Sequence, residues 1–434
     1  MSNVPELEAR LESRSARAGV VGLGYAGLPL AVEVARAGFE VIGIDIDPDR
    51  AGQINRGRSY MPDVDPGLLL EAVSSGRLRA TADYESIGAC DAVSICVPTP
   101  LRKTRDPDLT HVLEAVRSLQ THLRPGMLVV LESTTYPGTT DEVVLPILEE
   151  SGLRAGEDFF LCYSPERVDP GNSRYGTRNI PKVIGGVTSN CLRMGKLYYG
   201  QVMDTVVPVS STLAAEAAKL LENTFRMVNV GLANETAVLC DRLGIDVWEV
   251  IEAAGTKPFG FMPFYPGPGL GGHCIPVDPH FLAWKSKQAG FEPRLIQLAS
   301  EINGGMPRYI VGRIQSALND RGKPVRGSRI HLVGVAYKRN VADTRESPAL
   351  DIAALLARMG AEVAYSDPFV SRLKAGSLEL DRSGLFETVG ESDIAVILTD
   401  HDGVDYARLL GAASLVLDTR NATRGVAAPN LLRL

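Results

Sequence analysis

The chain has 434 residues, of which 45% are hydrophobic and 22% charged, a composition typical of a soluble globular protein with two or three domains. A net charge of −7 gives no electrostatic footprint for nucleic acid, so an anionic substrate has to be met by local hydrogen-bond donors. No apolar run approaches the roughly 20 residues of a membrane span, and the charged leader at residues 1–16 lacks a signal-peptide core, so we expect a cytoplasmic protein without a membrane partner.

A strand–helix–strand unit follows the leader. The stretch AGVVGLGYAGLPLAVEVARAGFEVIGIDID passes from a β-rich apolar run through a glycine turn and an Ala-rich helical pattern to a second β-rich run. Further strands are expected within 91–100, 127–135, 159–166 and 182–186, with helical segments between most of them. Strands that alternate with helices predict a parallel, doubly wound sheet.

A long helix is predicted from about 210 to 243, where the sequence has no proline and one glycine. Such a helix is suited to joining domains, whereas a surface shared between subunits does not follow from the sequence pattern. More helical pattern follows at 246–255 and 293–320, before a polar linker at 321–328.

The sequence beyond the linker echoes the first domain. RIHLVGVAYK resembles RAGVVGLGYA, GAEVAYSDP resembles GFEVIGIDI, and SDIAVILTD resembles CDAVSICVP. The second copy has no GxGxxG, so we expect it to contact substrate rather than a second dinucleotide. The predicted fold is therefore α/β, with two Rossmann-like doubly wound parallel-sheet domains joined by a long central helix. The expected divisions are a leader (1–16), an NAD-binding domain (17–208), a helical domain (209–320) and a second Rossmann-like domain (326–434).

A glycine fingerprint lies between the first expected strand and helix. Gly22, Gly24 and Gly27 form GxGxxG in the order that binds a pyrophosphate at a helix N-terminus. Asp45 ends the next strand, where a carboxylate binds ribose hydroxyls and favours NAD over NADP, although Arg50 could accept a 2′-phosphate. A glycine turn needed only for packing, or an FAD or SAM fold, remains an alternative.

Residues 263–281 surround Cys274 with prolines and glycines, which predicts a rigid, closely approached loop. The six cysteines are scattered without a CxxC pair, so neither a disulfide framework nor a zinc ribbon is indicated. The spacing of His273, Asp278 and His280 matches no common metal pattern, and we expect no metal. Cys274 is either a small core residue or a nucleophile assisted by Asp278.

Other polar residues stand where they can serve chemistry. Lys219 and Asn223 are four apart on the long helix and share a face, where lysine can stabilise an alkoxide, although a solvated lysine is the commoner case. Strand ends carry further candidates, although the threonines could merely cap helices: Thr99, Ser133, Thr134 and Glu166.

Seven motifs occur in one order: VGLGYAGLPLA, VPTP, STTYPGT, SPER, AAKLLEN, GPGLGGHCIPVDP and YKRNVADTRESPA. Together they resemble the nucleotide-sugar 6-dehydrogenase family, which is the UDP-glucose/GDP-mannose dehydrogenase family, from about residue 17 to 425. The resemblance implies an NAD-dependent, four-electron oxidation of a sugar's primary alcohol to a uronic acid, with thiohemiacetal and thioester intermediates on Cys274. It also implies a homodimer or higher homo-oligomer built around the long helix.

The resemblance also implies roles. Lys219 would stabilise oxyanions, Asn223 would hold the sugar hydroxyl, Asp278 would assist proton transfer, and Glu166 with Thr134 would activate the hydrolytic water. The residues expected against the cofactor are Gly22, Gly24, Tyr25, Ala26, Gly27, Asp45, Arg50, Thr99, Ser133 and Arg345. Those expected against the nucleotide sugar are Glu166, Arg167, Lys219, Asn223, Lys257, Gly269, Gly271, Gly272 and Lys338.

Two departures from the family pattern bear on the substrate. Pro170 stands where many UDP-glucose enzymes have a second glutamate, and Lys257 is the only cation where those enzymes have an arginine upstream of the cysteine. The motif spellings are most like the branch that oxidises UDP-N-acetylglucosamine, with UDP-N-acetylmannosamine second and UDP-glucose third. Neither the sugar nor its pathway follows from the motifs.

Two alternative functions differ from this four-electron oxidation in their chemistry. A two-electron β-hydroxyacid dehydrogenase also has lysine and asparagine four apart, but needs neither the cysteine nor a second Rossmann-like domain. A non-catalytic nucleotide-sugar sensor would be expected to lose at least one of Lys219, Asn223, Cys274 and Asp278, and all four are present.

Overall fold

The computed structural model describes residues 4–61, 64–169, 171–172 and 174–434. The chain forms two compact units. The first comprises Met1–Glu222 and His280–Phe291, and the second comprises Asn223–Pro279 and Glu292–Leu434.

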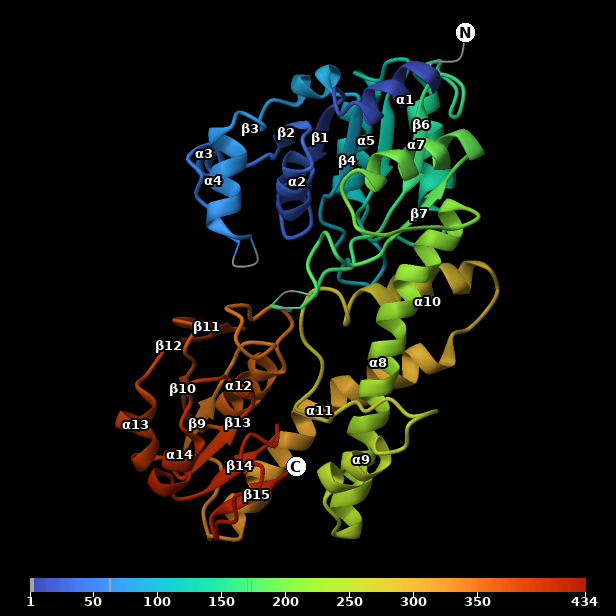
Figure 1. Cartoon of the computed structure of the whole chain (residues 1–434). Helices are drawn as coiled ribbons and strands as arrows, with labels where there is room; N and C mark the ends of the chain where they lie inside the picture. The colour runs from blue at the N-terminus through green and yellow to red at the C-terminus, as the bar shows by residue number, and fades with distance from the viewer. Residues whose placement is uncertain (1–3, 62–63, 170, 173) are drawn as a thin grey trace. The chain divides into compact units, whose positions relative to one another are not determined.

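An eight-stranded sheet is the centre of the first unit, in the order β3-β2-β1-β4-β5-β6-β7-β8 (Figure 1). Its strands are β1 (Arg17–Val21), β2 (Glu40–Ile44), β3 (Leu78–Thr81), β4 (Ala92–Ile95), β5 (Leu128–Leu131), β6 (Phe160–Tyr163), β7 (Lys182–Gly186) and β8 (Val206–Pro208). Each of the strands β1, β2, β4, β5 and β6 is a short apolar run that is almost wholly buried, as expected when helices cover both faces.

The predicted doubly wound sheet is confirmed, with one difference. All neighbouring strands are parallel except β6 and β7, which are antiparallel. A parallel pair needs a crossover, usually a helix. Within the described part of 164–181 no helix forms, which permits the reversed direction. The short strands β3 and β8 were not expected.

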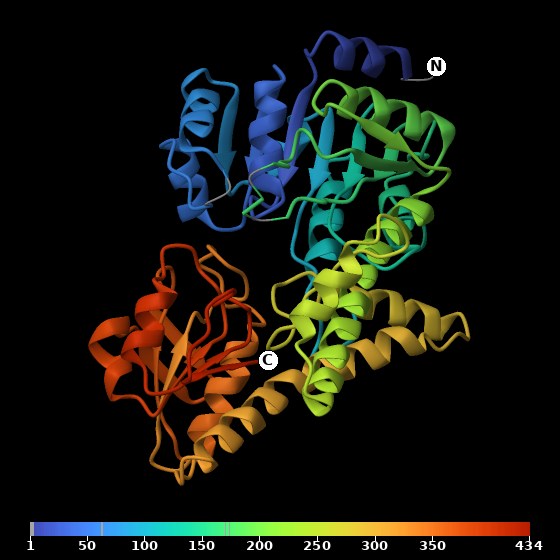
Figure 2. The same cartoon turned by 60° about the horizontal axis from the view of Figure 1, so that its bottom comes forward.

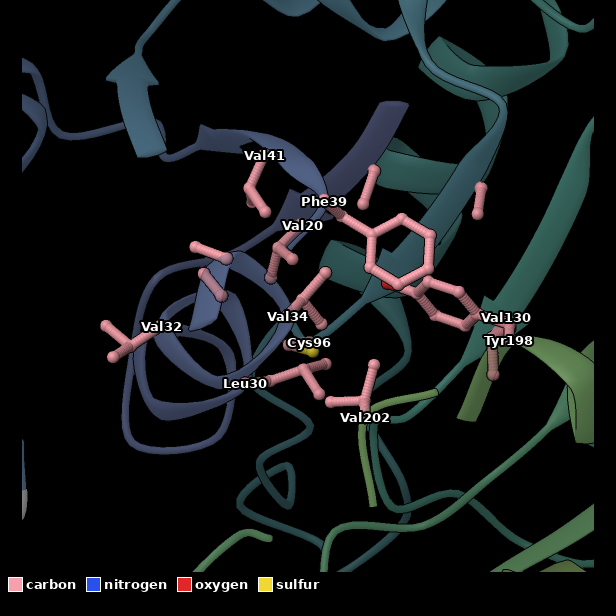
Figure 3. Packing of buried hydrophobic residues seen from close by; sticks show 14 of the residues in the cluster. Val20, Leu30, Val32, Val34, Phe39, Val41, Cys96, Val130, Tyr198 and Val202 are labelled. Atoms are coloured by element: carbon pink, nitrogen blue, oxygen red, sulfur yellow. The ribbon is translucent and has the colours of Figure 1, made fainter. Parts of the chain in front are cut away.

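Helices surround this sheet: α1 (Val4–Glu12), α2 (Gly27–Arg36), α3 (Pro48–Asn55), α4 (Pro66–Ser74), α5 (Thr110–Gln120), α6 (Leu145–Glu149) and α7 (Ser189–Gly200), with the short turns η1 (Tyr84–Ala89) and η2 (Thr140–Val144). Figure 3 shows side chains of α2 and of the strands packed together with Tyr198 of α7, and the Phe39 and Tyr198 rings meet edge to face with centroids 5.7 Å apart. The charged leader forms helix α1, whose Leu7 and Leu11 are buried in the same core.

The predicted long helix is α8 (Thr212–Leu243), which begins in the first unit and continues into the second. The remaining helices are α9 (Val247–Gly255), α10 (Asp278–Gln288), α11 (Arg294–Asn319), α12 (Pro348–Arg358), α13 (Leu385–Thr388), η3 (Val389–Glu391) and α14 (Tyr406–Ala412). Because α10 begins at Asp278, the loop expected over 263–281 ends at Val277, and its last residues form the first turn of a helix.

The second unit contains a five-stranded parallel sheet in the order β10-β9-β13-β14-β15, drawn in orange and red in Figure 2. Its strands are β9 (Arg329–Val333), β10 (Glu362–Ser366), β13 (Ile394–Ile397), β14 (Val416–Asp418) and β15 (Leu431–Arg433), and a hairpin is formed by β11 (Arg372–Ala375) and β12 (Leu378–Asp381). This order repeats β2-β1-β4-β5-β6 of the first sheet, so the internal repeat inferred from the sequence is a structural one.

The two Rossmann-like domains use their equivalent carboxylates differently. Asp45 follows β2 and accepts hydrogen bonds from the Leu23 and Asp47 amides. Asp367 follows β10 and accepts from five donors, namely the amides of Val335, Ala336, Phe369 and Val370 and the His401 ring.

Candidate active site

The three fingerprint glycines have different surroundings in the first unit. Gly22 has a φ of +87°, and a Cβ there would lie 2.7 Å from the Cys96 carbonyl oxygen, so it makes the tight turn after β1. A Cβ on Gly27 would lie 1.8 Å from the Gly22 carbonyl oxygen, which makes this glycine necessary for helix-to-strand packing. Gly24 has nothing within 4 Å of its Cβ position and leaves the backbone open to a ligand.

The start of α2 is suited to a pyrophosphate. Its N-cap residue, Ala26, provides no side-chain hydrogen bond, and the Leu28 amide donates to the Gly24 carbonyl at 3.1 Å, so an anion would meet the backbone before Leu28. Asp45 is buried at the end of β2, and Arg50 lies 3.7 Å from it and 3.5 Å from Asp47. Because Arg50 faces two carboxylates, it is poorly suited to a 2′-phosphate, and the residues fit NAD.

We predict that alanine at Gly27 lowers stability, whereas alanine at Gly24 lowers the affinity for NAD. Gly27→Ala forces a methyl group onto a backbone oxygen and should cost about 1–3 kcal/mol or more of unfolding free energy. Gly24→Ala should keep the wild-type melting temperature but raise the dissociation constant for NAD about tenfold or more. The added methyl group would occupy the open space through which the cofactor approaches the backbone. Thermal melts and NAD titration measure the two effects. A Gly24→Ala protein with unchanged NAD affinity would contradict this placement of the cofactor.

The predicted strand-end residues lie at one edge of the first sheet. Thr99 follows β4, Ser133 and Thr134 follow β5, and Glu166 follows β6, and these strands are neighbours and parallel. The Ser133 hydroxyl donates to the Val97 carbonyl at 2.8 Å and so fixes the VPTP turn. Sequence reasoning missed Thr135, whose fully buried hydroxyl has no hydrogen-bond partner among the described residues.

Glu166 and Arg167 are held by several contacts. Glu166 Oε1 accepts from the amides of Arg167 and Val168, each at 2.7 Å. The Arg167 guanidinium binds Glu222 of α8 at 2.7 Å and the Pro181 carbonyl at 2.6 Å. Arg167, expected against the substrate, therefore fastens the SPER segment to α8.

Near the start of α8, Lys219 is 8% exposed and Glu216 is fully buried. Glu216 accepts hydrogen bonds from the amides of Gly138 (2.5 Å) and Thr140 (2.9 Å) and from the Thr140 hydroxyl (2.7 Å). Burial raises its pKa from 4.5 to about 7, although these donors oppose the shift.

This shift predicts a pH-dependent stability. Between about 4.5 and about 7 the folded chain retains the Glu216 proton that the unfolded chain has released, so the free energy of unfolding falls as pH rises through this window. We expect Glu216→Gln to remove on the order of 2 kcal/mol of that fall. Denaturant unfolding at pH 5 and pH 7.5 measures the slope. Glu235→Gln, at an exposed site on the same helix, should keep the wild-type slope. Equal slopes for wild type and Glu216→Gln would refute the shift.

In the second unit the structure brings Asn223, Cys274 and Asp278 together. Asn223 Nδ2 donates to Asp278 Oδ2 at 2.5 Å, and the Asp278 amide donates to the Cys274 carbonyl at 2.7 Å. Of the six cysteines, all within the described residues, five are buried and Cys274 alone is partly exposed. Burial raises the pKa of Cys90 to about 12 and also raises those of Cys96 and Cys162, which keeps these thiols protonated.

The glycine loop before Cys274 packs closely on its own unit. A Cβ on Gly271 would lie 2.6 Å from Tyr337 Cβ, and one on Gly272, whose φ is +90°, would lie 2.9 Å from the Tyr337 ring. Gly269 packs similarly against Pro348. These glycines are thus required by protein packing, whatever they contact in the substrate.

Two buried asparagines that the sequence did not single out hold this loop. Asn234 of α8 accepts from the Gly267 amide at 2.9 Å and donates to Asn303 of α11 at 2.8 Å. An isolated asparagine in a helical pattern resembles a solvated residue, so only the fold reveals the pair.

The other predicted contacts are placed as follows. The Arg345 guanidinium binds Asp343 at 2.6 Å, and the Arg345 carbonyl accepts from the Gly272 amide at 3.0 Å. Lys338 is partly buried, in the segment of chain that connects β9 to α12. Lys257 is exposed after α9, with its ammonium 5.0 Å from the Phe259 ring centroid. Pro170 lies outside the described residues.

Comparison with known proteins decides the family. Three models of the UDP-glucose/GDP-mannose dehydrogenase family match: the NAD binding domain (16–203), the central domain (213–304) and the UDP binding domain (331–425). A UDP-N-acetyl-D-glucosamine 6-dehydrogenase of Pseudomonas aeruginosa is 40% identical over 82% of this chain and 83% of that protein. The chain belongs to the UDP-glucose/GDP-mannose dehydrogenase family.

Other relatives of this dehydrogenase carry a different substrate name. A UDP-N-acetyl-D-mannosamine dehydrogenase of Methanococcus maripaludis is 37% identical over 88% of this chain and 86% of that protein. The solved structure of UDP-D-ManNAc dehydrogenase from Pyrococcus horikoshii has a TM-score of 0.88 at 34% identity, covering 96% of this chain and 98% of that one.

Family membership confirms the resemblance seen in the sequence. The protein is an NAD-dependent nucleotide-sugar dehydrogenase, and the β-hydroxyacid dehydrogenase and sensor alternatives are set aside. Among the described residues, no helix combines the length and apolar character needed to cross a bilayer.

Proposed function

We propose that this enzyme oxidises the C6 alcohol of UDP-N-acetylglucosamine to the uronic acid by a four-electron route through Cys274. The observation that carries the covalent route is that Cys274 alone among the six cysteines is partly exposed, on a loop fixed by its glycines and by Asp278. The motif spellings and the relative from Pseudomonas aeruginosa favour the N-acetylglucosamine substrate. UDP-N-acetylmannosamine is the second candidate because other relatives bear that name.

Bound NAD supplies the hydride acceptor for both oxidations. In the proposed mechanism, Lys219 stabilises the alkoxide and later oxyanions, and Asn223 holds the reacting hydroxyl. Asp278 accepts a proton and orients Asn223, to which it is hydrogen-bonded. The Cys274 thiolate forms a C–S bond to the aldehyde carbon, and the resulting thiohemiacetal prevents escape of the aldehyde between the two oxidations.

The second oxidation leaves a thioester on Cys274. We propose that Glu166 and Thr134 then place a water molecule against the thioester carbon. A C–O bond forms, the C–S bond breaks, and the proton taken up by Glu166 passes to the leaving thiolate. Overall, one alcohol, one water and two NAD give one carboxylate, two NADH and three protons.

NADH yield tests this proposal. The enzyme, supplied with limiting sugar from a panel of UDP- and GDP-sugars, should release two NADH per sugar acid, fastest with UDP-N-acetylglucosamine. A yield of one NADH per sugar would overturn the four-electron route, and a preference for UDP-N-acetylmannosamine would establish the second candidate.

We also propose that the enzyme is a homodimer or a higher homo-oligomer. Phe225, Leu232, Leu239 and Leu243 are exposed on α8 at spacings of seven, seven and four, which place them on one face of the helix. A second copy of the same helix face would remove this apolar surface from water.

A further inference from the structure

A buried network of charges lies behind the predicted strand-end residues of the first unit. Lys182 is the first residue of β7 and is 4% exposed, and its ammonium binds the Glu132 carboxylate, which is 1% exposed directly after β5. The Tyr199 hydroxyl of α7 donates to the other Glu132 oxygen, and Ser94 Oγ lies 3.2 Å from that hydroxyl. Both Glu132 oxygens therefore have a donor.

The same ammonium also faces the Glu166 turn. Lys182 Nζ lies 4.0 Å from Glu166 Oε2 and donates to the carbonyl of Pro165, the preceding residue, at 3.3 Å. The opposite Glu166 oxygen is held by the Arg167 and Val168 amides. Lys182 thus contacts both the backbone of the turn and the carboxylate that the turn presents.

Electrostatics keeps this lysine charged. Burial lowers the pKa of Lys182, but the Glu132 and Glu166 carboxylates outweigh burial and raise it, whereas burial raises the pKa of the Glu132 carboxyl despite its Lys182 and Tyr199 donors. Buried ion pairs are weak evidence for stability, because apolar residues of similar size often serve a fold as well. Lys182 nevertheless keeps its cation between the buried Glu132 carboxylate and the partly exposed Glu166 carboxylate, and this arrangement calls for a functional explanation.

We propose that Lys182 is a positioning residue that fixes Glu166 for hydrolysis of the thioester. The inference rests on the proposed role of Glu166 as the group that places the water. Glu166 is the residue contacted by Lys182 to which we assign a step of the reaction, so loss of the cation should slow water attack and C–S cleavage while leaving the two oxidations intact. The enzyme would then accumulate as the acyl-enzyme on Cys274.

The experiment compares the wild type with three variants of the full-length enzyme. Lys182→Met removes the cation but leaves Glu132 buried with one donor, so it is at risk of misfolding. The double variant Lys182→Met/Glu132→Gln removes both charges and relieves that problem while still depriving Glu166 of its cation. Tyr199→Phe is the matched control, since it disturbs Glu132 without contacting Glu166.

For each protein we would measure the melting temperature, NAD affinity, the first-turnover NADH burst, kcat, and the mass of acid-quenched enzyme. In the folded double variant we expect kcat to fall about ten- to a hundredfold, with a burst near two NADH per site and a mass increase on Cys274. Tyr199→Phe should turn over within about threefold of wild type without that adduct.

Two results would overturn the positioning role. One is a double variant with wild-type kcat, and the other is a loss of the burst in parallel with kcat in a folded, NAD-binding protein. Failure of the underlying function is separable, because it would appear as one NADH per sugar in the wild type. A double variant that fails to fold would also count against the proposal, since it would show that Lys182 serves stability beyond its pairing with Glu132.

Discussion

Cys274→Ser should lower kcat for uronic acid formation by about three orders of magnitude or more. Serine keeps the shape of the side chain in this packed loop, but its hydroxyl is a far weaker nucleophile than a thiolate. The aldehyde would no longer be held as a thiohemiacetal, and the thioester could not form. We expect the reaction to stop at the aldehyde or an adduct, measured as at most one NADH per sugar and as aldehyde captured by a hydrazine reagent.

The control is Cys240→Ala, which removes a buried thiol from α8 in the same unit. It should lower stability modestly and keep two NADH per sugar. Normal turnover by Cys274→Ser with two NADH per sugar would rule out covalent catalysis and would leave the thiol a packing role.

Lys219→Met should lower kcat by about a hundredfold or more, because the variant lacks the positive charge that stabilises the developing alkoxide and the tetrahedral oxyanions. Methionine retains the unbranched apolar stem, which suits a side chain that is 8% exposed on α8. Since the charge acts mainly in the transition state, KM should change much less than kcat. Steady-state kinetics with saturating NAD provides both values.

Lys196→Met tests whether any loss of lysine has this effect, because Lys196 is exposed on α7. It should retain wild-type kcat. If Lys219→Met raised KM while kcat stayed unchanged, Lys219 would be a binding residue only, and another donor would have to stabilise the oxyanions.

Much of the fold could be predicted because its signals are local. The glycine fingerprint, the buried apolar strands and the proline-free stretch that forms α8 each determine an element from adjacent residues. The antiparallel β6–β7 pair was missed because strand direction depends on the connection rather than on the strand sequence. The start of α10 at Asp278 was missed because nearby prolines and glycines dominate the local pattern.

The site could be predicted only as far as motifs identify individual residues. The Asn223–Asp278 hydrogen bond joins residues 55 apart in sequence, and the Arg167–Glu222 pair likewise, so neither contact is visible in the chain. The motif predicts a substrate contact for Arg167, and nothing in the sequence indicates its ion pair with Glu222. Lys182 could not be found either, since a lysine that begins a strand is usually solvated.

The Asp367 carboxylate of the second Rossmann-like domain is fully used by hydrogen bonds within the protein, and this limits how the enzyme could be redesigned. A designer who restored GxGxxG after β9 would recover the turn, because Gly334 already has a φ of +76°. The ribose anchor would still be missing, since Asp367 is committed to four backbone amides and His401. Converting this domain to bind a second dinucleotide would require replacing His401 and redirecting the backbone at Val335 and Ala336. The two halves of the repeat have therefore diverged by internal hydrogen bonding as well as by loss of glycines.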